Sequence, residues 1–231
     1  MICSSLNLLF LIVLLPFLFA AELSFCHVQF LGVRSFPHIY NRKMPEEIVE
    51  QISQIRSLIG WADSFGMSSA ARVPLSPSVS TTRTVLRFRD KYMAEDRNVL
   101  TGYDASEGAL YILFAAVLCL HPSTPKLFAI DNADHGLNPV LARRLIECVC
   151  KWVLQSKQTR QILLTSHNPL ILDGLPLQDE RVRLFTVDRS SDGKSVVNRI
   201  KVTDELIKKA KEGWTLSRLW VMGHLGGIPN V

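Results

Sequence analysis

One stretch of the chain decides the fold: Lys126-Leu-Phe-Ala-Ile-Asp131-Asn-Ala-Asp-His-Gly-Leu-Asn-Pro139. Its apolar run, residues 127–130, lies between a proline and a polar segment, which predicts a short strand buried on both faces, as in a parallel sheet. The strand ends in Asp131, and open α/β sheets bind their ligands at the C-terminal edge of the strands. A carboxylate at that edge can hold Mg²⁺, although an aspartate there can also simply cap a helix.

The elements after this strand continue an alternation of helix and strand. A helix is expected from Pro139, with Asn138 as its N-cap and an apolar stripe that includes Trp152. A second buried-type strand is expected over residues 161–165. This alternation predicts an α/β fold with a mainly parallel sheet and flanking helices. Farther on, strands over 183–189 and 195–202 flank Ser190-Ser-Asp-Gly193, which predicts a hairpin.

The part of the chain before this stretch predicts two helices and a strand. Isoleucines at helical spacing predict a helix that begins at Pro45. Residues 84–89 are expected to form a strand, and residues 109–120 a buried helix that is capped by Asp104 or by Ser106. The remaining expectations are a weak strand over 28–36, a loop over 73–82, a Lys-rich helix from Thr203 and a helix over 214–222.

The composition indicates a globular α/β domain with a sizeable core. The chain has 231 residues, of which 48% are hydrophobic and 20% charged, with a net charge of +5. This basic balance more often reflects a solvated face than nucleic-acid binding. The candidate nucleic-acid contacts are two basic clusters, Arg83, Arg87, Arg89 and Lys91, and Lys208, Lys209 and Lys211. The five cysteines are odd in number and show no C-x-x-C spacing, so buried free thiols are expected instead of disulfides or a zinc site.

The first residues form a separate hydrophobic leader. Residues 6–21 are almost wholly apolar and resemble the core of a signal peptide, but Met1–Ser5 contains no Lys or Arg. The run is also short for a transmembrane helix. An export signal, a membrane anchor and a remodelled start joined to a cytosolic domain are the three interpretations. We favour the third, which predicts a cytoplasmic protein without a membrane partner.

Three features occur in a fixed order: Ser106-Glu107-Gly108 before a buried helix, Asp131 at a strand end, and His167 at the end of the next strand. This ordered set resembles the second half of the ABC/SMC-type ATPases, including the AAA-type core domains of predicted bacterial ATPases related to the OLD family. The resemblance covers roughly residues 82–231. The matching motifs are Ala105-Ser-Glu-Gly108 for the signature, Phe128-Ala-Ile-Asp131-Asn-Ala for Walker B, Asp134-His-Gly-Leu-Asn-Pro139 for the D-loop, and Leu163-Leu-Thr-Ser-His167-Asn-Pro for the switch histidine.

The resemblance implies a P-loop NTPase fold that binds ATP and Mg²⁺. Asp131 would hold the Mg²⁺, and His167 would sense the γ-phosphate and the attacking water. Ser106, Glu107 and Gly108 would meet the γ-phosphate of ATP on another subunit, with Asp134 also at the nucleotide. The implied partner is therefore a second copy in an ATP-dependent homodimer, or a complete ATPase subunit. DNA repair or phage defence would be the process, with DNA as a further candidate partner.

Two departures from the family pattern stand out. Asn132 occupies the place of a glutamate that activates water in many relatives, and an amide cannot accept a proton. Slow hydrolysis is therefore expected, with Asp134 as a candidate substitute base. The P-loop motif G-x-x-x-x-G-K-[ST] is absent, and Gly193-Lys194-Ser195 falls in the expected hairpin turn. The chain is thus expected to lack the N-terminal Walker A lobe and to bind nucleotide weakly when alone.

These expectations divide the chain into a leader over 1–27, a remnant of the N-terminal lobe with a helical insertion over 28–103, and an ABC-type ATPase core over 104–231. Three functions compete. The first is an ATPase core that hydrolyses ATP. The second is a degenerate, non-hydrolysing half that acts as a regulatory or interaction module. The third is an exported or membrane-anchored protein that reuses the fold.

Overall fold

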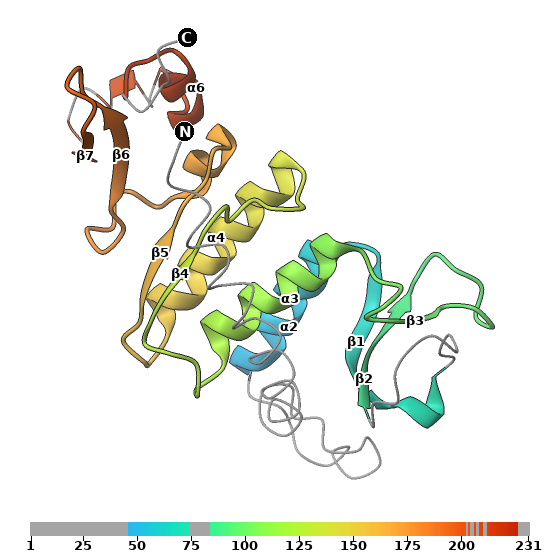
Figure 1. The fold of residues 1–231 in the computed structure, drawn as a ribbon. Coiled ribbons are helices and arrows are strands. Elements are labelled where there is room, and N and C mark those ends of the chain that lie inside the picture. Colours follow the sequence, from blue (N-terminus) through green and yellow to red (C-terminus); the bar gives the residue numbers. More distant parts are fainter. Residues whose placement is uncertain are drawn as a thin grey trace. The chain divides into compact units, whose positions relative to one another are not determined.

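The computed structural model describes residues 46–73, 84–201, 203, 206, 208–209 and 212–225. The chain forms two compact units, Met1–Val117 and Leu118–Val231 (Figure 1). Three of the expected segments lie wholly or largely outside the described residues: the leader, the strand over 28–36 and the loop over 73–82. Most of the Lys-rich helix expected from Thr203 lies outside them as well.

In the first unit, the described residues begin with the predicted amphipathic helix, α2 (Glu46–Ile59). Its buried side chains are Ile55, Leu58 and Ile59, and the acidic pair at its start suits the positive end of the helix dipole. Gly60 ends the helix with a positive φ of 72°, and its N–H donates to the Arg56 carbonyl at 2.9 Å. A glycine takes this conformation without the steric cost that a side chain would bring.

The sheet of the first unit is antiparallel, in the order β1-β2-β3. Its strands are β1 (Ala62–Ser69), β2 (Thr84–Asp90) and β3 (Val99–Thr101), with a short 3₁₀ turn, η1 (Ala70–Arg72), after the first. The sequence predicted β2, whereas β1 has no β-branched residue and gave no strand signal. Phe88 of β2 is fully buried, and its ring centroid lies 5.2 Å from that of Trp61.

The helix α3 (Glu107–Leu120) is capped by Ser106, which resolves the choice between two candidates. The Ser106 hydroxyl oxygen accepts from the Ala109 N–H at 3.3 Å. Asp104 has another task, because its Oδ2 accepts from both the N–H (2.9 Å) and the hydroxyl (2.7 Å) of Thr101. The buried stripe of the helix consists of Ala109, Ile112, Ala115, Ala116 and Cys119.

The second unit contains a parallel β–α–β arrangement: β4 (Leu127–Ile130), α4 (Pro139–Gln155) and β5 (Gln161–Leu164). The register pairs Leu127 with Gln161 and Ile130 with Leu164. The predicted N-cap is confirmed, because Asn138 Oδ1 accepts from the Leu141 N–H at 2.9 Å. The buried stripe of α4 consists of Ala142, Leu145, Ile146, Val149 and Trp152.

The prediction that β4 is buried on both faces was wrong. The side chains of Leu127 and Leu163 are 65% and 60% exposed, whereas Ile130 on the opposite face of β4 is buried. The prediction of a mainly parallel sheet was also wrong for the described residues, because β4–β5 is their one parallel pair and the other two sheets are antiparallel. An apolar run shows that a strand tolerates burial, but the layers packed on it decide which face is covered.

The predicted hairpin is present as β6 (Leu184–Arg189) and β7 (Ser195–Ile200). Gly193 in its turn has a φ of 83°, and the Ser190 N–H donates to the Lys194 carbonyl at 2.9 Å. The Lys194 ammonium pairs with Asp192 at 2.7 Å. Gly193-Lys194-Ser195 is therefore part of a hairpin turn, as expected, and not a phosphate-binding loop between a strand and a helix.

The C-terminal helix α6 (Leu216–Val221), expected over 214–222, is fastened to the 3₁₀ segment η2 (Pro169–Gly174). One carboxylate makes this connection: Asp173 accepts from the Ser217 N–H at 2.9 Å and from the Ser217 hydroxyl at 2.6 Å. Among the described residues, no helix combines the length and the apolar character that crossing a bilayer requires.

The start of β5 is tied to the end of α3 by one guanidinium. Arg160 donates to the carbonyl oxygens of Leu118 at 2.9 Å and Cys119 at 2.6 Å, and also to that of His121. A helix leaves its last carbonyls without partners, and an arginine at this end satisfies them while opposing the helix dipole. Arg160 thereby joins the residue before β5 to the carbonyl end of α3.

Gly174 allows η2 to pack directly on α4, and substituting it tests this packing. A Cβ at this position would lie 2.7 Å from the Arg143 carbonyl oxygen and 3.3 Å from Glu147 Cγ. We predict that Gly174→Ala lowers the free energy of unfolding by about 1–3 kcal/mol. Gly66→Ala is the matched control, because a Cβ on Gly66 meets nothing within 4 Å. Urea unfolding followed by circular dichroism measures both, and equal midpoints would contradict the close packing.

Candidate functional site

The candidate site lies where β4 and β5 end. The strands are parallel, so the residues that follow them meet at the same edge of the sheet. Backbone hydrogen bonds continue the pairing past both strands. The Thr165 N–H donates to the Ile130 carbonyl at 3.1 Å, and the Ala133 N–H donates to the Thr165 carbonyl at 2.8 Å. The loops that begin at Asp131 and at Thr165 are therefore held side by side.

Asp131 is exposed at this edge, and a hydroxyl of the neighbouring strand end holds its carboxylate. The Thr165 hydroxyl donates to Asp131 Oδ1, and Thr165 Oγ1 accepts from the Asn132 N–H at 3.0 Å. Since Asn138 caps α4, Asp131 is not needed for that task. The carboxylate is thus oriented from one side and open to solvent.

Asn132 adopts a left-handed backbone conformation, with a φ of 51°. It is the one non-glycine residue with positive φ among those the structure describes. Its carbonyl accepts from the His135 N–H at 2.8 Å, which tightens the turn. Asparagine tolerates this conformation better than most residues with a side chain. The left-handed backbone conformation therefore favours asparagine at position 132, whether or not its side chain takes part in chemistry.

Asp134 is half-buried and is engaged by the second loop. Its Oδ1 accepts from the Ser166 hydroxyl at 2.7 Å, and Ser166 Oγ accepts from the Asn168 N–H at 3.0 Å. Asn168 Oδ1 in turn accepts from the Leu170 N–H at 3.1 Å and caps η2. One oxygen of Asp134 is therefore committed to holding the two loops together.

His167 lies between the two anchored residues of this second loop, Ser166 and Asn168. Its side chain is exposed, while its neighbours are fixed by the hydrogen bonds just described. The structure thus places four of the predicted residues in the two adjoining loops: Asp131, Asn132, Asp134 and His167.

The other three predicted residues belong to the first unit, at the start of α3. Ser106 and Glu107 are exposed, and Gly108 is half-buried. The Ser106 hydroxyl is engaged as the helix cap. These residues and the strand-end residues lie in separate units.

Sequence reasoning missed the two residues that organise the strand ends, Thr165 and Ser166. A signal for them was present, because two consecutive hydroxyl residues, Thr165 and Ser166, stand at the end of the strand expected over 161–165, level with the acidic loop after β4. Hydroxyls at that level can hydrogen-bond to carboxylates across a parallel pair.

The side chains at this edge suit Mg²⁺ only if phosphate oxygens supply some of its other ligands. Within the described residues, no cluster of three or more His, Cys, Asp or Glu side chains could hold a metal ion. The site contributes one exposed carboxylate, that of Asp131. Mg²⁺ is commonly held by one or two carboxylates together with phosphate oxygens and water, so the residues fit a magnesium–nucleotide complex better than a free ion.

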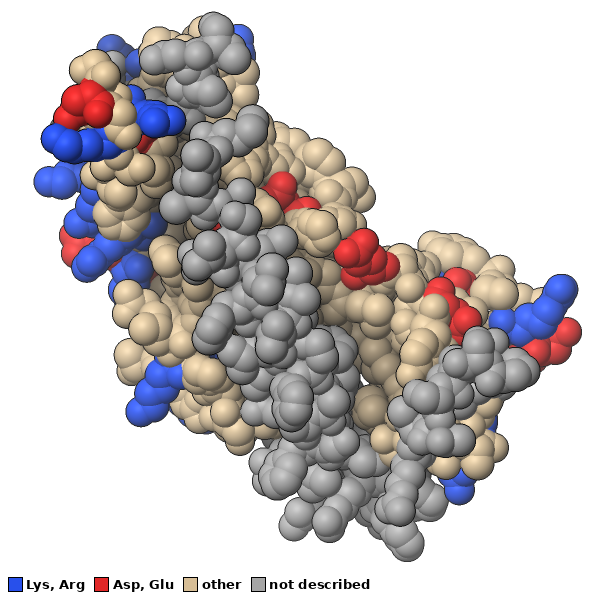
Figure 2. Space-filling view, viewed as in Figure 1, with Lys and Arg blue, Asp and Glu red and all other residues tan. Residues whose placement is uncertain are grey.

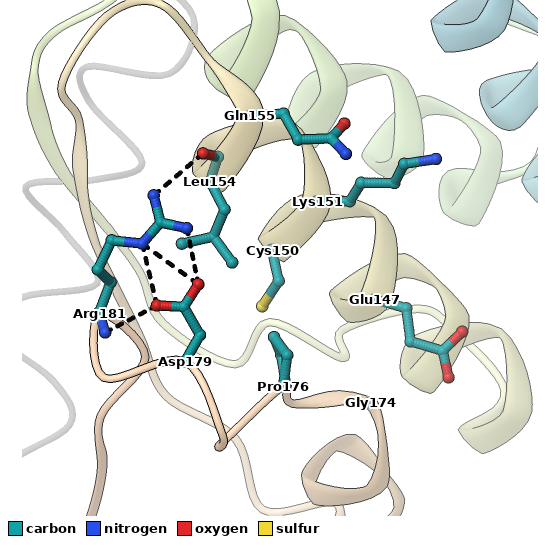
Figure 3. Close-up of a pocket in the computed structure, with 9 residues that line it drawn as sticks. All are labelled: Glu147, Cys150, Lys151, Leu154, Gln155, Gly174, Pro176, Asp179 and Arg181. Atoms are coloured by element: carbon teal, nitrogen blue, oxygen red, sulfur yellow. Dashed lines mark hydrogen bonds and ion pairs between the residues drawn. The ribbon is translucent and has the colours of Figure 1, made fainter.

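A hollow of about 410 Å³ lies elsewhere in the second unit, between α4 and the segment after η2 (Figure 3). Arg181 pairs with Asp179 at 2.7 Å and donates to the Leu154 carbonyl at 3.2 Å, and its guanidinium lowers the pKa of Asp179 to about 2. Burial raises the pKa of the Cys150 thiol to about 11, which keeps the thiol protonated and unreactive.

The two strand-end loops lie where open α/β sheets bind their ligands, outside the carboxyl ends of parallel strands. Residues 34–173 match the family described as "AAA domain, putative AbiEii toxin, Type IV TA system". The match covers more than half of the chain, so the chain belongs to this family of AAA-type ATPase domains.

Comparisons with curated proteins and with solved structures provide less information about the class of protein. No curated protein matches the chain. A solved structure described as "Structural biochemistry of ATP-driven dimerization and DNA stimulated activation of SMC ATPases" is 14% identical. The match covers 73% of this chain and 91% of that chain, with a TM-score of 0.42. The family match is therefore the finding that defines the class of protein.

The left-handed conformation of Asn132 yields a stability prediction. Asn132→Ala and Asn132→Gly both remove the amide side chain and differ only in the Cβ, which is disfavoured at a φ of 51°. We predict that the alanine variant unfolds with a free energy about 1 kcal/mol lower than that of the glycine variant. Urea unfolding of the two proteins measures the difference. A glycine variant less stable than the alanine variant would show that the conformation does not constrain this position.

Proposed function

We propose that this chain is the ATP-binding core of a dimeric, ATP-gated ATPase. One observation carries the proposal: in a chain of the AAA-domain family, β4 ends in an exposed carboxylate that a hydroxyl from the neighbouring parallel strand orients. That carboxylate stands at the sheet edge where α/β proteins bind nucleotides. The family membership and the geometry of the edge therefore support the same activity.

In this proposal Asp131 supplies a carboxylate oxygen to Mg²⁺, and Thr165 fixes the direction of that carboxylate. When bound with ATP, Mg²⁺ would neutralise charge on the phosphates. His167 is proposed to meet the γ-phosphate, because its exposed imidazole stands on the loop that Ser166 anchors. Asn132 is proposed to orient the attacking water, which an amide can do without accepting its proton.

The dimer is supported by the exposed start of α3. Ser106, Glu107 and Gly108 surround a helix N-terminus, whose backbone amides and dipole favour an anion such as a phosphate. We propose that this surface meets ATP held by a second copy of the chain or by a complete ATPase subunit. Asp134, through its bond to Ser166, would keep the loop after β4 in place at the same interface.

The process served is proposed to be DNA repair or phage defence. The family description names a putative toxin of a Type IV TA system, which we take as support for the defence alternative. The core of the machine would be residues 104–231, which contain α3, both strand ends and the hairpin.

A second candidate function is a non-hydrolysing half that regulates a complete ATPase subunit. Asn132 favours this candidate, because its side chain cannot act as a base and one oxygen of the nearby Asp134 is engaged by Ser166. Both candidates bind nucleotide at the same strand ends and differ in whether the water is activated.

Turnover of ATP separates the two candidates. We predict slow hydrolysis by the full chain at millimolar MgATP, and an increase on the order of 10²-fold in Asn132→Glu, since a general base contributes about 10²–10⁴-fold. Asn132→Gln is the matched control, because glutamine has the size and backbone strain of glutamate but no basic oxygen. Phosphate release measures the rates.

Asp131→Asn completes this experiment. The asparagine can still accept from the Thr165 hydroxyl but carries no charge for Mg²⁺, so it should abolish hydrolysis in the Asn132→Glu background. A fast wild-type protein that Asn132→Glu leaves unchanged would contradict the role given to Asn132. Hydrolysis that survives Asp131→Asn would contradict the site itself.

A further inference from the structure

The hairpin β6–β7 has two faces of different character. Successive residues of a strand point to opposite faces, and the register pairs Phe185 with Arg199 and Val187 with Val197. These residues share the first face, where Phe185, Val187 and Val197 are 47%, 63% and 62% exposed. The opposite face includes Thr186, which is buried. We call this surface the cationic face: Phe185, Val187, Arg189, Ser195, Val197 and Arg199 of the paired strands, with Arg183 just before β6 and Lys201 just after β7.

The cationic face carries four positive charges and no carboxylate. Asp188 belongs to the opposite face, where it accepts from Asn198 Nδ2 at 3.1 Å, and Asp192 pairs with Lys194 in the turn. Within the described part of the chain, no ion pair involves any of the four cations of this face. Figure 2 shows Lys and Arg, with some Asp and Glu beside them, in the part of the chain that holds β6 and β7, at the upper left.

Apolar side chains occupy the middle of this face. Val187 and Val197 lie directly opposite each other, and Phe185 lies next to Val187 on the same side of β6. The cations flank this centre, with Arg189 toward the turn and the other three toward the open end of the hairpin. A ligand that contacts both the cations and the apolar centre of this face must carry anionic groups next to a flat apolar surface.

We propose that the cationic face binds single-stranded nucleic acid. Arg199 lies on β7 and Lys201 directly follows this strand. The two residues are two positions apart, roughly 6.6 Å at about 3.3 Å per extended residue, a spacing comparable to that of successive phosphates along an extended nucleic-acid strand. The guanidinium fork suits a phosphate, which it can bind with two hydrogen bonds. The ring of Phe185 offers a surface on which an unpaired base can stack beside Arg199.

Other anionic partners fit this face less well. A duplex presents its phosphates but keeps its bases stacked inside, which would leave Phe185 and the valines without an apolar partner. An anionic membrane needs apolar side chains that reach into the acyl layer, whereas these lie among longer arginine and lysine side chains. The cationic face contains no residue of the strand-end site, so nucleic-acid binding by this face is independent of the proposed ATPase function.

The test is binding of a fluorescein-labelled oligothymidylate of about 15 nucleotides to the full chain without ATP, followed by fluorescence anisotropy. Four phosphate contacts predict that log K falls against log salt with a slope of about −3. The double variant Arg199→Ser/Lys201→Ser should reduce the magnitude of that slope by about 1.4. Phe185→Ala should weaken binding on the order of tenfold without changing the slope.

The matched control is the double variant Lys126→Ser/Lys157→Ser, which removes two exposed charges of the same unit away from the hairpin. It should retain the affinity and the slope. An equal loss of affinity in this control would show that binding depends only on the net charge, and would overturn the proposal. The proposal would also be overturned if a blunt duplex, phosphatidylserine vesicles or polyglutamate bound as tightly as the single strand. An unchanged affinity in Phe185→Ala would overturn it as well. Unchanged thermal unfolding of each variant ensures that a loss reports binding.

Discussion

Two hydrogen bonds between hydroxyls and carboxylates join the loops that follow β4 and β5, and the geometry of the site depends on them. Thr165 donates to Asp131, and Ser166 donates to Asp134. Short parallel strands define an edge but do not fix the loops beyond it. These bonds, with the backbone bond from Ala133 to the Thr165 carbonyl, extend the order of the sheet by several residues. An oriented carboxylate at an otherwise open edge is the result.

The sequence could predict those elements that are determined by interactions between residues close together in the chain. The periodicity of α2 and α4, the cap at Asn138 and the turn at Gly193 all follow from residues within a few positions of each other. The positions of Asp131, Asn132, Asp134 and His167 after two neighbouring parallel strands also agree with the sequence, because the carboxyl ends of parallel strands meet at one edge. Their roles at a nucleotide stay a prediction.

The features that the sequence could not predict depend on contacts between distant segments. The exposed face of β4, seen at Leu127, is decided by which layers cover the sheet and not by the apolar run itself. Strand β1 forms through its pairing with β2 despite weak propensity. The left-handed conformation of Asn132 follows from its bonds to Thr165 and His135, which adds a structural cause to a residue first considered only for catalysis.

The central claim is that the ends of β4 and β5 bind a metal–nucleotide complex, and paramagnetic relaxation tests it residue by residue. The ¹⁵N-labelled full chain would be titrated with a non-hydrolysable ATP analogue and Mn²⁺ at millimolar concentration, which also detects weak binding. The account predicts selective broadening of the amide signals of residues 131–135 and 165–168, lost in Asp131→Asn. Signals of these two loops that stay sharp, or broadening that survives Asp131→Asn, would contradict it.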